Sequence, residues 1–205
     1  IGSSKALSSL VGESNNIQNV AIGTDALSNA VNGQYNIAIG IGAMFNVGSN
    51  SSETYGDVSA NVAIGSGALK GTGTRPQGAN NVAIGTASML NVTSGDDSAL
   101  TAQYNTCVGA QSGYNLEGQQ NVYIGATSGQ GAPNNNTGNF NIAVGAYSFT
   151  AVTDGTYNTT VGYDAGDTIT TGDYNICIGY QADVDAADAQ NRVAIGKSIT
   201  CTADN

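Results

Sequence analysis

A five-residue pattern, Asn-Val-Ala-Ile-Gly, recurs along the whole 205-residue chain and limits the folds that the chain can adopt. Its closing glycines follow one another at spacings of 16 to 25 residues, and a truncated copy, Ile1-Gly2, precedes the first full one. Repeats of this length predict a solenoid, because each unit buries its apolar side chains only by stacking on its neighbours. The copies of this pentad are Asn19–Gly23, Asn36–Gly40, Asn61–Gly65, Asn81–Gly85, Asn105–Gly109, Asn121–Gly125, Asn141–Gly145, Asn158–Gly162, Asn175–Gly179 and Arg192–Gly196.

The second and fourth positions of the pentad are β-branched in every copy, which is typical of a short strand. Side chains two residues apart on a strand share a face, so we predict that these pairs point into the solenoid. The aliphatic members of this predicted core ladder are Val20, Ile22, Ile37, Ile39, Val62, Ile64, Val82, Ile84, Val122, Ile124, Ile142, Val144, Ile176, Ile178, Val193 and Ile195.

The third position is usually Ala, but Cys107, Tyr123, Thr160 and Cys177 also occupy it. A site that accepts both Ala and Tyr indicates a side chain outside its own coil, facing solvent or another chain. Asn at the first position suits a hydrogen bond to a neighbouring backbone, and equivalent Asn residues of successive coils are expected to stack as a ladder.

Most pentads are followed by a small residue three positions later, such as Ala26 or Ser88, which predicts a second short strand or corner on the opposite wall. Coils longer than 17 residues carry their extra length in loops along one edge, of which 45–60 and 91–104 are the longest. Such loops are common recognition surfaces. The candidate ligand contacts in them are Ser51, Glu53, Tyr55, Asp96, Asp97 and Tyr104.

An aromatic residue precedes the pentad Asn in several coils, as in Tyr35, Phe140, Tyr157 and Tyr174. We interpret these side chains as structural, with stacking against a glycan as the alternative.

The net charge of −10, with only five Lys and Arg residues, argues against nucleic-acid binding, which needs a basic surface. Binding to an anionic membrane is disfavoured for the same reason, and no apolar run is long enough to cross a bilayer. Cys107, Cys177 and Cys201 are odd in number and lack metal-ligand spacing, so we interpret them as small packed side chains.

The absence of His excludes the catalytic systems in which His activates a Ser or Cys nucleophile. Carboxylates cluster toward the C-terminus, where solvated surface is the first interpretation and calcium binding or glycoside hydrolysis are the alternatives. We therefore expect no catalytic, cofactor or metal site, with Ca²⁺ as the one metal left open. The clustered residues are Asp154, Asp164, Asp167, Asp173, Asp183, Asp185 and Asp188.

The segments Asn19–Leu27 and Asn61–Leu69 resemble the head repeats of trimeric autotransporter adhesins and the similar repeats of bacteriophage tail fibres. This resemblance covers nearly the whole chain. It implies a left-handed parallel β-roll, a homotrimer, and a structural or adhesive role. The longer, variable period and the absence of a heptad stretch depart from the adhesin pattern and favour a virion fibre.

Together these observations predict one all-β parallel solenoid of about ten to eleven coils over residues 1–205, as part of a longer fibre protein. The expected function is a non-enzymatic structural or adhesive segment of an extracellular, cell-surface or virion fibre that attaches to a host-surface glycan or protein receptor. The alternatives are a tailspike-type glycan hydrolase and a structural shaft without a ligand.

Overall fold

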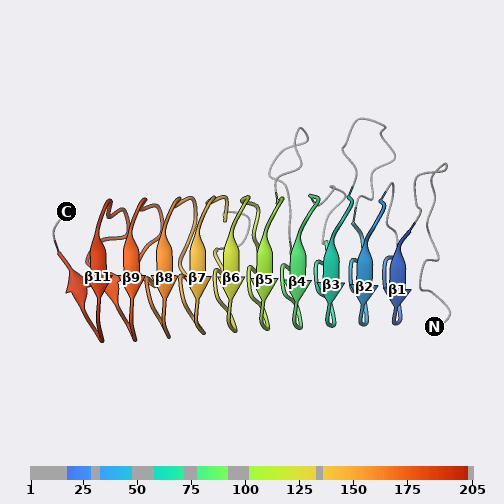
Figure 1. Cartoon of the computed structure of the whole chain (residues 1–205), viewed down its shortest axis with the longest axis horizontal. Coiled ribbons are helices and arrows are strands. Elements are labelled where there is room, and N and C mark those ends of the chain that lie inside the picture. Colours follow the sequence, from blue (N-terminus) through green and yellow to red (C-terminus); the bar gives the residue numbers. More distant parts are fainter. Residues whose placement is uncertain are drawn as a thin grey trace.

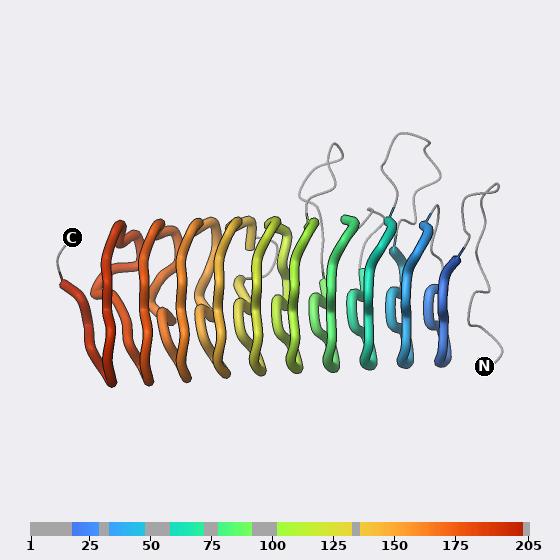
Figure 2. The backbone as a smooth tube through the Cα atoms, viewed as in Figure 1, coloured from blue at the N-terminus to red at the C-terminus, as the bar shows by residue number. Residues whose placement is uncertain are grey.

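The structure is a computed structural model that describes residues 18–28, 33–47, 58–71, 78–91, 102–132 and 136–202. Successive coils stack along one axis, with β1 and β11 at opposite ends of the molecule (Figure 1). The coils follow one another in chain order along this axis (Figure 2). The described residues form no helix, and the parallel β-solenoid predicted from the repeat is confirmed, with about nine turns.

Each pentad contributes one three-residue strand to a single parallel sheet of ten strands. Its members, in order, are β1 (Val20–Ile22), β2 (Ile37–Ile39), β3 (Val62–Ile64), β4 (Val82–Ile84), β5 (Thr106–Val108), β6 (Val122–Ile124), β7 (Ile142–Val144), β8 (Thr159–Val161), β9 (Ile176–Ile178) and β11 (Val193–Ile195). Two-residue strands β10 (Asp183–Val184) and β12 (Thr200–Cys201) pair on the opposite wall. Equivalent pentad positions lie side by side throughout the large sheet, as Ala63 does between Ala38 and Ala83.

The orientation predicted for the strands is wrong: the third pentad position points into the coil, and the second and fourth point outward. Ala63, Cys107 and Tyr123 have no exposed surface, whereas Ile142 is 43% exposed. All members of the predicted core ladder, from Val20 and Ile22 to Val193 and Ile195, are half-buried or exposed. Because strand side chains alternate between faces, the buried Asn at position one and the residue at position three share the inner face.

The interior accepts both Ala and Tyr at position three because a second residue compensates for the difference in size. This residue, here called the turn position, is the fourth after the pentad glycine. In five of the six coils with Ala at position three, the turn position is large and buried, and its occupants are Leu27, Met44, Leu69, Met89 and Phe149. After Ala194 it is the exposed Thr200. Where position three is Cys107, Tyr123 or Thr160, the turn position is glycine.

Glycine is required at these turn positions by the space available. A Cβ on Gly113 would lie 2.5 Å from the sulfur of Cys107, and a Cβ on Gly129 would overlap the ring of Tyr123. Protein interiors are close-packed, so a larger residue at position three goes with glycine at the turn position in these three coils. The size variation at position three is therefore compatible with a buried site.

The pentad asparagines form the predicted ladder inside the coil. The Oδ1 of Asn121 accepts a hydrogen bond from the backbone N–H of Asn141 at 2.8 Å. Its Nδ2 donates to Oδ1 of Asn105 at 3.2 Å and to the carbonyl of Gly138 at 2.9 Å. The same backbone-to-Oδ1 bond joins every successive pair from Asn19 to Asn175, and the backbone of Arg192 ends the series at 3.0 Å. These bonds satisfy buried polar groups that would otherwise destabilise the coil.

The pentad glycine allows neighbouring coils to approach closely. Gly65 has a φ of +135°, and a Cβ there would lie 2.5 Å from the carbonyl oxygen of Gly85 in the next coil. Neither the backbone angle nor the space suits an L-residue with a side chain.

Candidate functional site

The outer face of the ten-stranded sheet is aliphatic apart from Thr106 and Thr159. We call the side chains at pentad positions two and four the outer sheet face. None of the residues in the ten strands is charged. Val20, Ile37, Ile124, Ile142 and Ile176 on this face are 37 to 45% exposed. A continuous exposed apolar surface of this kind marks an interaction site more often than a solvated surface.

Two columns of aromatic side chains border this face near its C-terminal end. Phe140, Tyr157 and Tyr174 precede β7, β8 and β9, and their rings stack with centroids 4.8 and 4.9 Å apart and planes within 4°. On the other border, Tyr163 and Tyr180 stack at 5.5 Å. The ring faces within these columns are covered by the neighbouring rings. Glycan stacking, the alternative considered for these residues, would therefore be restricted to the two ends of a column.

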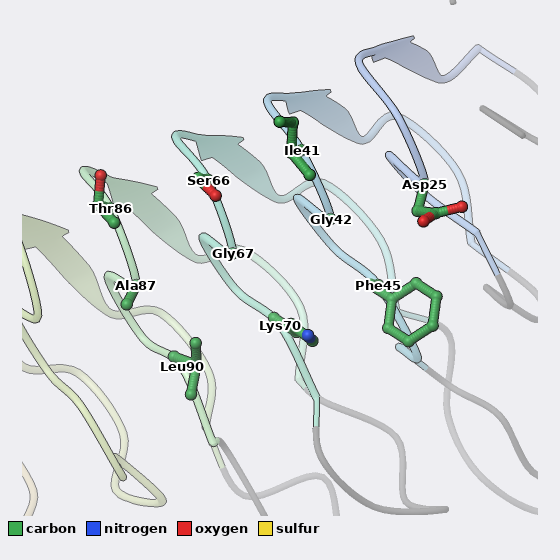
Figure 3. A pocket seen from close by; sticks show the side chains of 10 residues that line it. All are labelled: Asp25, Ile41, Gly42, Phe45, Ser66, Gly67, Lys70, Thr86, Ala87 and Leu90. Atoms are coloured by element: carbon green, nitrogen blue, oxygen red, sulfur yellow. The ribbon is translucent and has the colours of Figure 1, made fainter. Parts of the chain in front are cut away.

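A surface groove with a volume of about 380 Å³ crosses the turns that follow β1 to β4 (Figure 3). We call it the turn groove. Its floor is formed by Gly42, Gly67 and Ala87, and one row of side chains lies on each side of that floor (Figure 3). The complete lining consists of Asp25, Ile41, Gly42, Phe45, Ser66, Gly67, Lys70, Thr86, Ala87 and Leu90.

The turn groove combines an aromatic ring with groups of opposite charge. The ammonium of Lys70 lies over the ring of Phe45, 5.3 Å from its centroid, as expected for a cation–π contact. Asp25 supplies a carboxylate, and Ser66 and Thr86 supply hydroxyl groups. This set of side chains suits a ligand that has both an apolar surface and hydroxyl groups.

Of the candidate ligand contacts predicted from the sequence, the structure describes only Tyr104. Its side chain is 55% exposed and lies before β5, whereas the turn groove lies after the strands. Ser51, Glu53, Tyr55, Asp96 and Asp97 lie outside the described residues. Sequence reasoning missed the turn groove, although the small residues Gly42, Gly67 and Ala87 at equivalent positions were a visible signal.

Several of the C-terminal carboxylates take part in bonds that hold the coils. Asp173 accepts hydrogen bonds from the backbone N–H and the hydroxyl of Thr156, each at 2.8 Å. Asp185 forms an ion pair with Arg192. Across the described part of the chain, no three His, Cys, Asp or Glu side chains are grouped as a metal site would require.

Asp167 and Asp183 are two neighbouring carboxyl groups that could be considered as a catalytic pair. Desolvation, followed by the hydrogen bond to Asp183 and its charge, raises the pKa of Asp167 to about 6. Carboxyl groups that hydrogen-bond to each other are closer than the roughly 5 Å that separates the pair of a retaining glycosidase. This geometry suits a shared proton better than attack on a glycoside.

The buried cysteines lack the surroundings of a nucleophile. Burial is the main cause that raises the pKa of Cys177 to about 12, and it also raises the pKa of Cys107. A reactive cysteine needs a lowered pKa and access to solvent, and neither residue has them. All three cysteines are free thiols.

Comparison with known proteins found no matching family model, no similar curated protein and no similar solved structure. Within the described ranges, no helix has the length and hydropathy needed to cross a membrane.

Proposed function

We propose that this chain is a non-enzymatic structural and adhesive segment of an extracellular or virion fibre, and that three copies assemble around its long axis. The observation that carries the proposal is the outer sheet face, which is apolar in every coil and uncovered in the single chain. The uncharged strands allow like faces to meet without charge repulsion.

The construction of the coil supports a load-bearing role. Each coil is joined to the next by strand pairing, by the Asn ladder and by close glycine contacts, so bending the solenoid would disturb all three. Repeat proteins gain stability from such nearest-neighbour interfaces. The C-terminal carboxylates support this function over glycan hydrolysis. Asp173 and Asp185 already bond to other residues of the coils, so they are not free to act on a substrate.

Solution mass of the wild-type chain and of Ile142→Lys tests the assembly. We expect three chains for the wild type and one for the variant, because a lysine on the outer sheet face would place an unpaired charge inside the interface. The coil itself should still form, since Ile142 is 43% exposed in the single chain.

Thr171→Lys is the matched control, because Thr171 is exposed and lies outside the ten strands. It adds the same charge and should leave the mass at three chains. A wild-type chain that remains a monomer at micromolar concentration would exclude the proposed assembly.

A further inference from the structure

The turn groove exists because three successive coils carry a small residue two positions after the pentad glycine. Gly42, Gly67 and Ala87 occupy this position in the groove. The equivalent residues of later coils include Gln111, Thr127 and Tyr147, which have larger side chains. The hollow is therefore a property of these coils and not of the repeat in general.

The backbone of the groove floor has no amide available for a ligand. The N–H groups of Gly42, Gly67 and Ala87 donate to carbonyls of the preceding coil at 2.8 to 2.9 Å. Binding of a peptide by strand addition, or of a phosphate by a backbone nest, would need free amides. Recognition in this groove must therefore come from side chains.

The side chains present alternate in chemistry along the groove. Phe45 and Leu90 offer apolar surface, Ser66 and Thr86 offer hydroxyls, and Asp25 and Lys70 carry opposite charges that cancel. Lys70 lies beside Phe45, so a ligand against the ring has a charged hydrogen-bond donor next to it. The balance of charge favours a neutral ligand that both donates and accepts hydrogen bonds.

On the basis of the adhesive function proposed above, we propose that the turn groove binds a neutral saccharide unit of a surface glycan. The apolar face of a sugar ring lies against the face of Phe45 that the Lys70 ammonium does not cover. Its hydroxyls donate to the Asp25 carboxylate and accept from the Lys70 ammonium, and Ser66 and Thr86 complete the contacts. Sugar-binding sites of this kind combine aromatic contact with a few fixed polar groups.

Filling the groove with a residue that the fold already accepts at this position tests the proposal. Gly42 and Gly67 have φ values of +62° and +64°, and Gln111 adopts +56° at the equivalent position. A Cβ at Gly42 would lie 4.0 Å from the Cβ of Phe45, and one at Gly67 would lie 3.3 Å from the end of the Leu90 side chain. The double variant Gly42→Gln/Gly67→Gln should therefore fold and leave the groove filled.

The measurement is saturation-transfer NMR from the protein to the methyl glycosides of glucose, galactose, mannose and N-acetylglucosamine. We expect transfer to at least one of them in the wild type and its loss in the double variant. Thr127→Gln, which introduces the same residue at the equivalent position outside the groove, should retain the transfer.

Absence of transfer to all four glycosides in the wild type would overturn the inference, and so would equal transfer in the double variant. Solution mass is measured on the same samples. A trimer that binds none of these sugars would refute saccharide binding in the groove and leave the fibre proposal standing. A monomer that binds one of them would refute the trimeric assembly and support saccharide binding in the groove.

Discussion

At the scale of single residues, the coil interior depends on pairs of positions. Ala63 with Leu69 and Tyr123 with Gly129 are two solutions to the same packing problem. The hydrophobicity of Val and Ile suggested that they form the core, but the ladder Asn at position one faces inward, so strand alternation places position three beside it and positions two and four outside. The sequence contains a signal for the inner face. A glycine stands six residues after each of Cys107, Tyr123 and Thr160, where it leaves space for the larger side chain.

Exchange of one packing solution for the other tests this pairing. Tyr123→Ala alone should destabilise the protein by about 3–5 kcal/mol through the cavity it leaves. Gly129→Leu alone should destabilise it as well, because the new side chain would overlap the Tyr123 ring. The double variant should recover most of the loss, since it recreates the pair seen at Ala63 and Leu69, and Leu69 already adopts a positive φ.

Thermal or denaturant unfolding of the four proteins gives the coupling between the two sites. Additive losses in the double variant would mean that the two side chains do not share one space.

At the scale of the elements, the strands and the Asn ladder could be predicted from the sequence, and the second wall could be predicted only in part. The strand bounds follow the pentads, because β-branched residues between Asn and Gly favour a short strand. The opposite wall contains strands only at β10 and β12 among the described residues. Elsewhere it is formed by turns in which small residues such as Ser112 bond to the next coil, here to the carbonyl of Tyr123 at 2.9 Å.

Loss of one rung tests whether the Asn ladder stabilises the stack. Asn121→Ala should leave the backbone N–H of Asn141 and the carbonyl of Gly138 buried without these partners. Each unsatisfied buried group costs roughly 1–3 kcal/mol, so we expect a loss of a few kcal/mol in the free energy of unfolding.

Gln120→Ala is a suitable comparison, because Gln120 is the adjacent residue and alanine retains the backbone N–H that it donates to the carbonyl of Gln103. A similar unfolding free energy for Asn121→Ala and Gln120→Ala would show that the ladder contributes little.

At the scale of the whole molecule, the coils produce a rod with one apolar face, two aromatic borders and a groove after the first strands. The parallel solenoid followed from the repeat, because the recurring pentad aligns equivalent positions even though the spacing varies from 16 to 25 residues. The small residues Gly42, Gly67 and Ala87 are visible in the sequence, but the wall that they reach is not, so the sequence alone does not locate the turn groove. Of the ligand contacts expected in the loops, all but Tyr104 lie outside the described ranges.

The inward orientation of pentad position three, with positions two and four pointing outward, underlies both the packing of the coil and the proposed assembly. The native cysteines test it without any substitution, because Cys107 and Cys177 occupy position three and have no exposed surface, whereas Cys201 is partly exposed. Titration of the folded chain with a thiol reagent should modify Cys201 alone, and all three thiols should react after unfolding in denaturant. Rapid modification of Cys107 or Cys177 in the folded chain, located by mass spectrometry of its peptides, would contradict the inward orientation.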